Sequence, residues 1–199
     1  GDYAASLDAL AALDDPAAGE LSARQRARAA NIRGDVFAYT DRDPDAELEY
    51  RRALELLPDA RLSREEHAVI EGRALGGLAA LHHFAGEHRA AQALFAQVVA
   101  LLVPIFGEYH PDTIWARTSL GSVAYAGGDN DLARASWEQA LQTAKRVLSE
   151  DNPEVGTLKN NLGRLLLEEG RYDEAEPMLR DAAALLAACF SLPGGVLRA

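Results

Sequence analysis

One short segment carries aromatic and hydroxyl side chains at spacings suited to noncovalent binding. The residues are Trp115, Thr118, Ser122 and Tyr125, separated in turn by three, four and three positions. In an α-helix these separations place the four side chains in one stripe. A stripe of aromatic rings and hydroxyl groups fits an interface better than a core, although a single aromatic residue at helical spacing is also typical of a core. We predict that this stripe binds another molecule.

A second candidate is the pair of neighbouring asparagines, Asn160 and Asn161. Asparagine is a mediocre helix former, so two adjacent ones within a helix indicate a function, although they could also be solvated surface residues. Each amide offers a hydrogen-bond donor and an acceptor, and can therefore pair with the backbone of an extended peptide. The chemistry expected here is recognition rather than catalysis.

Histidines near the middle of the chain raise the question of a metal site. His82, His83 and His88 lie close to Glu87, but Gly86 is expected to end a helix between them, and no Cys or Asp completes a set of four ligands. The chain also contains no P-loop, no dinucleotide-binding fingerprint and no Ser or Cys nucleophile in a recognisable setting. The sequence therefore predicts no metal, no cofactor and no enzyme.

Composition narrows the choice of partner. The formal net charge is −11, and no cluster of Lys or Arg could neutralise a run of phosphates, so nucleic acid is not expected. No stretch of about 18 apolar residues is uninterrupted and no charged-then-apolar leader is visible, so we expect neither a membrane span nor a secretory signal. The single cysteine, Cys189, fits a reducing compartment, and we expect a cytoplasmic protein.

The elements that position these side chains follow from an internal repeat of 42 residues. The repeated positions are a glycine, a small residue and a bulky residue, found as Gly86, Ala91 and Phe95, then Gly128, Ala133 and Trp137, then Gly170, Ala175 and Leu179. The glycine ends one helix, the small residue lets two antiparallel helices approach, and the bulky residue fills their shared core. His110-Pro111-Asp112 and Asn152-Pro153-Glu154 keep the same spacing, and the proline suits the first turn of the next helix.

Earlier parts of the chain fit the pattern with more drift. Gly34, Ala46, Tyr50 and Ala53 fall at the spacings of a 34-residue unit, with Asp41 at the position of the turn glycine. The opening segment reads as the second helix of a truncated repeat, so we expect the chain to start inside a longer array. The expected helices are 3–14, 20–40, 44–57, 63–85, 88–106, 111–127, 130–149, 154–169 and 172–190, with a capping box at Ser63-Arg-Glu-Glu66.

These residues resemble tetratricopeptide repeats, and the 42-residue units resemble the kinesin light chain subtype, which is also common in bacterial proteins. The resemblance covers about residues 1 to 189 and implies an all-α, right-handed superhelical solenoid of antiparallel helix pairs with about four and a half repeats. It implies one solenoid domain over 1–190, with a partial repeat at 1–14 and repeats at 27–60, 72–109, 114–151 and 156–189. Residues 191–199 would be a tail or linker.

Stacked helix pairs of this kind leave a concave groove lined by the first helix of each pair. A small residue recurs in each first helix, as Gly34, Ala79, Gly121 and Gly163. Helical spacing from these residues assigns the side chains that face the groove. They are Arg28, Asn31, Asp35 and Tyr39, then Arg73, His83 and Phe84 with Gly77, then Trp115, Thr118, Ser122 and Tyr125, then Asn160, Asn161, Arg164 and Glu168. The resemblance implies that groove asparagines hold a peptide backbone, with Asn161 at the closer match.

The leading functional hypothesis is a protein- or peptide-binding scaffold module within a larger signalling or regulatory protein. The carboxylate clamp of co-chaperones is absent, because its positions hold Asn31, Asp35, Gly77, Trp115 and Ser119, so an acidic chaperone tail is not the expected ligand. One alternative is self-assembly into a homo-oligomer through the open ends of the solenoid. Another is binding of a regulatory small ligand in the groove around His83, Trp115 and Tyr125.

Overall fold

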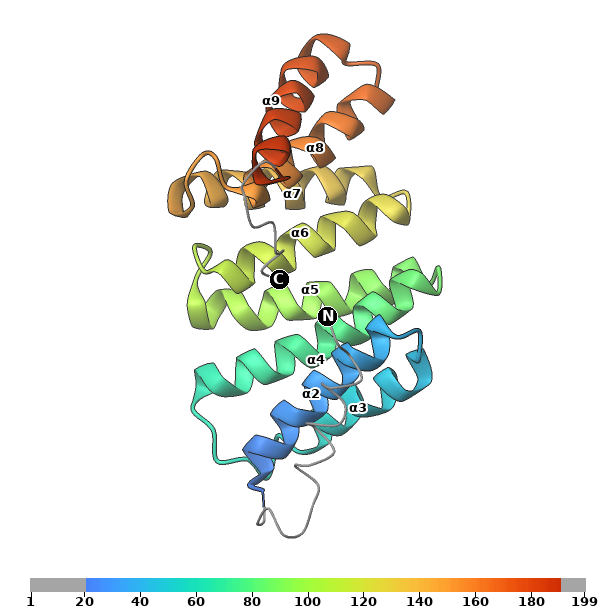
Figure 1. The fold of residues 1–199 in the computed structure, drawn as a ribbon, viewed down its shortest axis with the longest axis vertical. Helices are drawn as coiled ribbons and strands as arrows, with labels where there is room; N and C mark the ends of the chain where they lie inside the picture. The colour runs from blue at the N-terminus through green and yellow to red at the C-terminus, as the bar shows by residue number, and fades with distance from the viewer. Residues whose placement is uncertain (1–20, 191–199) are drawn as a thin grey trace. The chain divides into compact units, whose positions relative to one another are not determined.

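The computed structural model describes the backbone of residues 21–190 and the side chains of residues 21–187. The helix expected at 3–14 and the tail expected at 191–199 lie outside these residues. The described part contains eight α-helices and no strand. The helices are α2 (Ala23–Tyr39), α3 (Asp43–Glu55), α4 (Arg64–Phe84), α5 (His88–Phe106), α6 (Pro111–Ala126), α7 (Asn130–Val147), α8 (Pro153–Glu168) and α9 (Tyr172–Phe190) (Figure 1). Their ends agree with the expected ends to within three residues.

The helices pack as four consecutive pairs, α2 with α3, α4 with α5, α6 with α7 and α8 with α9 (Figure 1). These pairs belong to two compact units, α2 to α5 and α6 to α9. Within each unit the second helix of one pair also packs on the first helix of the next, α3 on α4 and α7 on α8. This is the nearest-neighbour packing of a helical repeat protein.

Helix starts follow the local sequence. Ser63 accepts a hydrogen bond from the backbone N–H of Glu66 at 3.1 Å, and the Glu66 carboxylate accepts one from the Ser63 backbone N–H, which confirms the predicted capping box. The side chains of His110 and Asn152 each accept from the backbone N–H two residues later, and a proline follows each of them. Side-chain oxygens or nitrogens thus satisfy backbone donors that a helix start leaves without a partner.

The turns within the pairs use a left-handed backbone at the predicted glycines. Gly86, Gly128 and Gly170 have φ values of 78°, 82° and 75°. Asp41 holds the equivalent place between α2 and α3 with a φ of 56°, which makes it the one non-glycine residue with positive φ among the described residues. The first turn therefore keeps the geometry of the repeat without its glycine.

Close contact within the pairs depends on a small residue facing a bulky one. A Cβ added at Gly34, Gly121 or Gly163 would come within 2.6 Å of Tyr50, 2.5 Å of Trp137 or 2.6 Å of Leu179, respectively. The structure corrects the assignment of Gly77 to the groove. A Cβ there would come within 2.3 Å of the Tyr50 ring, so Gly77 marks the approach of α4 to α3 and presents no side chain to a ligand.

Helix α5 is, among the described helices, the one long and apolar enough to cross a membrane by length and composition. Its fully buried residues are Ala91, Phe95, Val98 and Leu102, at spacings of four, three and four. These spacings form a single stripe, as expected for a helix that buries one side against its partner. The partner is α4, which packs along α5 in the hairpin.

Candidate functional site

The predicted groove residues fall on the first helices of the pairs, and each unit holds one group of them. The α2/α4 face comprises Arg28, Asn31, Asp35, Tyr39, Arg73, His83 and Phe84. The α6/α8 face comprises Trp115, Thr118, Ser122, Tyr125, Asn160, Asn161, Arg164 and Glu168.

Asp35 is the centre of the α2/α4 face. Its carboxylate accepts a hydrogen bond from the Tyr50 hydroxyl at 2.9 Å and one from Nε of Arg73 at 3.0 Å. Burial, followed by the charge of Asp35 and this hydrogen bond, raises the pKa of Tyr50 far above its ordinary value. Asp35 therefore ties the core of the first pair to the first helix of the second, and its oxygens are already occupied.

The start of this face is also joined across the two helices. Glu66 lies 2.7 Å from Arg24 and 3.7 Å from Arg28, so two cations of α2 share one carboxylate of α4. Asn31 is only 2% exposed, and its Nδ2 donates to the Ile70 carbonyl at 2.9 Å. Asn31 thus acts as a link between α2 and α4, and its buried side chain offers little surface to a ligand.

Aromatic rings occupy the other end of the α2/α4 face. Tyr39 is 69% exposed and Phe84 is 81% exposed. The His83 ring lies 5.5 Å from the Phe84 ring and 5.4 Å from the His88 ring, measured between centroids. Burial, followed by the proximity of His88, lowers the pKa of His83, so the neutral imidazole is favoured there.

The histidines of this hairpin do not converge on a metal site. His82 instead contacts the carboxylate of Glu87 through Nδ1. Across the described residues, no group of three or more His, Cys, Asp or Glu side chains is placed to hold a metal ion.

On the α6/α8 face, hydroxyl groups are engaged close to the backbone. The Thr118 hydroxyl lies 2.9 Å from the Ile114 carbonyl oxygen and 2.9 Å from the Glu154 carboxylate at the start of α8. The Ser122 hydroxyl donates to the Thr118 carbonyl at 3.0 Å. Sequence reasoning missed Glu154, although it lies seven positions before Asn161 and therefore on the same side of α8, which was the available signal.

Tyr125 joins α6 to α8 near the end of both helices. Its hydroxyl donates to the Glu168 carboxylate, and the guanidinium carbon of Arg164 lies 5.5 Å from the centroid of its ring. The hydrogen bond to Glu168 is the main cause that raises the pKa of Tyr125. On its inner side the ring packs against buried Trp137, at 5.6 Å between centroids. Tyr125 is therefore held in place before any ligand arrives.

Three residues of the α6/α8 face present an exposed ring or an open amide group that a ligand could contact. Trp115 is 45% exposed. Asn160 and Asn161 are half-buried, and neither side chain forms a hydrogen bond with another described residue. Two half-buried amides with open donors and acceptors on α8, and an exposed indole on α6, are groups that can pair with a peptide backbone and cover it.

Comparison with known proteins identifies the fold. The tetratricopeptide repeat family model matches residues 70–136 and 117–188, which together span more than half of the chain. Over 113 residues the chain is 34% identical to Protein KINESIN LIGHT CHAIN-RELATED 2 of Arabidopsis thaliana, and over 110 residues it is 32% identical to the human Clustered mitochondria protein homolog. These alignments cover 56% and 54% of this chain but only 17% and 8% of the relatives.

A solved structure agrees with this result. The crystal structure of BtubC (BKLC) from P. vanneervenii superimposes with a TM-score of 0.79 at 17% identity, over 100% of this chain and 79% of that one. At this identity the likeness concerns the fold alone. The predicted fold class, a solenoid of antiparallel helix pairs of the tetratricopeptide type, and the resemblance to kinesin light chain repeats are confirmed.

Proposed function

Because the chain belongs to the tetratricopeptide repeat family, whose solenoids generally serve as non-enzymatic scaffolds for protein interactions, we propose that it binds an extended peptide segment of another protein. The proposed contact surface is the α6/α8 face. The partner is a protein, and the chemistry is noncovalent recognition.

The observation that carries this proposal is the pair of unpartnered amides at Asn160 and Asn161. An extended peptide presents one N–H and one C=O at each non-proline residue, and these groups need partners once water is excluded. An asparagine amide supplies both partners whatever the side chains of the peptide are. Thr118 and Ser122, in contrast, already engage groups of the protein, so they shape the surface rather than bind the peptide.

Trp115 and the cluster around Tyr125 support the same surface. An exposed indole on α6 can bury a peptide side chain, and aromatic anchors usually carry a large share of interface energy. Arg164 stacks near the Tyr125 ring and forms no ion pair with a described carboxylate, so its charge is available to a carbonyl or carboxylate of the peptide. The peptide would then lie along α6 and α8, between Trp115 and Arg164.

The proposal extends to the biological setting. The curated relatives are much longer than the matched segment, since the alignments cover 17% and 8% of their lengths. We infer that the chain works as a scaffold module of a larger signalling or regulatory protein in the cytoplasm, where its single cysteine, Cys189, would stay reduced.

A peptide-display selection tests the proposal. A library of random peptides is selected on the wild-type chain, and the recovered peptides are then measured against an Asn160→Ala, Asn161→Ala double variant. A matched control is Gln142→Ala, which removes an exposed amide from α7 outside the α6/α8 face. We expect the control to bind as the wild type does and the double variant to bind more than about tenfold more weakly. Equal affinity for a folded double variant would remove the asparagines from the site.

A further inference from the structure

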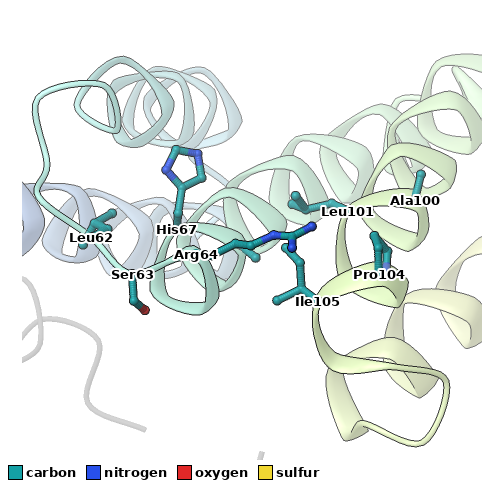
Figure 2. Close-up of a pocket in the computed structure, with 9 residues that line it drawn as sticks. Leu62, Ser63, Arg64, His67, Ala100, Leu101, Pro104 and Ile105 are labelled. Carbon is teal, nitrogen blue, oxygen red and sulfur yellow. The ribbon is translucent and has the colours of Figure 1, made fainter.

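A cavity of about 530 Å³ lies in the first unit between the beginning of α4 and the end of α5 (Figure 2). None of its lining residues belongs to the α2/α4 face. They are Leu62, Ser63, Arg64, His67 and Ala68 from the start of α4, and Ala100, Leu101, Pro104 and Ile105 from the end of α5.

The cavity combines an apolar wall with an unpaired positive charge. Leu62, Leu101 and Ile105 are half-buried around it, and Figure 2 shows the Arg64 side chain extended from α4 toward Leu101 and Ile105. Arg64 has no described carboxylate within ion-pair distance. In a chain of net charge −11, where Arg24 and Arg73 do pair with carboxylates, a free guanidinium above an apolar wall favours an anionic ligand with an apolar body.

A backbone acceptor adds a third feature. Pro104 lies inside α5 and has no N–H, so the carbonyl of Ala100 does not receive the usual helical hydrogen bond from the residue four positions later. Ala100 and Pro104 both line the cavity. A ligand that brings an N–H group to this carbonyl would supply the donor that the proline removes.

We propose that this cavity binds the carboxyl end of a peptide whose last side chain is apolar. The carboxylate pairs with Arg64, the last side chain packs on Leu101 and Ile105, and an amide N–H donates to the Ala100 carbonyl. A fatty acid or a phosphate offers the charge but no amide N–H, so the acceptor at Ala100 favours a peptide end. This site is separate from the α6/α8 face and does not depend on it.

The first test compares two probes on the whole, isotope-labelled chain by NMR titration. The probes are acetyl-glycyl-leucine with a free carboxylate and the same compound as its carboxyl-terminal amide. We expect the amide to bind about tenfold more weakly, because it lacks the charge that pairs with Arg64. Equal affinity of the two probes would overturn the proposal, and this comparison needs no variant.

Two variants locate the binding. Arg64→Gln should weaken binding of the free acid about tenfold, whereas Arg89→Gln, which removes an exposed arginine from the first turn of α5, should leave it unchanged. If the probe leaves the chemical shifts of residues 62–68 and 100–105 unchanged, it binds elsewhere and the proposal is wrong. The proposal is also wrong if a folded Arg64→Gln variant binds the free acid as tightly as the wild type.

The backbone acceptor is tested by Pro104→Ala, which restores an N–H to α5. This variant should bind acetyl-glycyl-leucine several-fold more weakly without losing thermal stability, because the helix now satisfies the Ala100 carbonyl itself. The probe 4-methylpentanoate has a similar apolar body and carboxylate but no amide, so it should bind more weakly than the peptide and should not respond to Pro104→Ala. Equally tight binding of 4-methylpentanoate would show a site for simple carboxylates and contradict the peptide assignment.

Discussion

The α2/α4 face and the α6/α8 face occupy equivalent places in two repeat pairs, yet their side chains are used differently. On the α2/α4 face, Asp35 pairs with Arg73 across the helices, and Arg28 pairs with Glu66 beside the face. On the α6/α8 face, Asn160 and Asn161 remain without protein partners. The two faces thus share a frame but not a pattern of occupied groups.

The two faces also differ in how closely their first helices approach each other. Helices α2 and α4 contact each other directly, whereas α6 and α8 approach less closely and are joined by long side chains such as Tyr125 and Glu168. Where the first helices are close, the short side chain of Asn31 reaches the neighbouring backbone, and its Nδ2 donates to the Ile70 carbonyl. Wider spacing leaves amides free, and this difference leads us to expect ligand binding on the α6/α8 face.

The largest expected effect concerns the exposed aromatic residues of the two faces. Trp115→Ala should weaken binding of a selected peptide by about 2 kcal/mol or more, because large aromatic anchors dominate interface energies. Tyr39→Ala, on the α2/α4 face, should change the affinity by less than about 0.5 kcal/mol. Calorimetry on both variants, with melting temperatures as the folding control, makes the comparison. A loss for Tyr39→Ala equal to that for Trp115→Ala would mean that both faces bind.

The next effect is on stability. Asp35→Ala should lower the free energy of unfolding by about 1 to 3 kcal/mol, because the buried Tyr50 hydroxyl loses its acceptor. The exposed guanidinium of Arg73 adds little, since water screens it. Glu168→Ala should cost clearly less, because its hydrogen bond with the Tyr125 hydroxyl is exposed to water. Urea unfolding of both variants measures the difference, and equal losses would contradict the distinction between a buried and an exposed link.

A smaller effect tests the amides directly. Asn161→Ala should weaken peptide binding by about 1 to 2 kcal/mol, the cost of leaving a peptide polar group without its partner, while stability stays nearly unchanged. The same titration on Gln142→Ala is the control and should give the wild-type affinity. If the true ligand binds Asn161→Ala as tightly as the wild type, the contact surface shifts toward Arg164 and Tyr125.

The last comparison concerns the pH dependence of stability. Both Tyr50 and Tyr125 have raised pKa values, mainly through burial for Tyr50 and through the Glu168 hydrogen bond for Tyr125. A raised tyrosine pKa means that the unfolded chain loses its proton first. The stabilisation is therefore complete below the ordinary pKa of about 10 and is lost as the pH rises above it.

The difference in tyrosinate absorbance between the wild type and Glu168→Gln, followed against pH, isolates Tyr125 from the other tyrosines. Glu168→Gln should bring the pKa of Tyr125 down toward its ordinary value, because the charged acceptor is its main cause, and should leave the titration of Tyr50 unchanged. An unchanged titration of Tyr125 in this variant would show that the link between Tyr125 and Glu168 does not hold in solution.

The helices were predictable because each repeat position has a strong local reason. The turn glycines, the capping Ser63 and the proline after Asn152 act within a few residues, so the sequence alone locates most helix ends. The repeat pattern also predicted which small residue faces which bulky one, such as Gly121 and Trp137.

Spacing along one helix could not predict which polar side chains of the two faces already have partners within the protein. Helical periodicity puts Asn31 on the same side of α2 as Asp35. The Asn31 amide, however, donates a hydrogen bond to the backbone carbonyl of Ile70, 39 residues away. Gly77 likewise lies against Tyr50 of another pair, a contact that depends on how closely α3 and α4 approach. Such partners belong to a neighbouring repeat, so a stripe on one helix does not reveal them.

The left-handed turn at Asp41 bears on how repeats drift apart during evolution. A φ of 56° strains a residue with a side chain, by about 1 kcal/mol for the left-handed region, and glycine would relieve this strain. Glycine would also give the unfolded chain more freedom, which costs a similar amount, about 0.4 to 1 kcal/mol. Because the two contributions nearly cancel, exchange between Asp and Gly at position 41 is close to neutral for stability. Selection on stability alone would hardly notice it, so the register of a repeat array can persist after its consensus residues have been replaced.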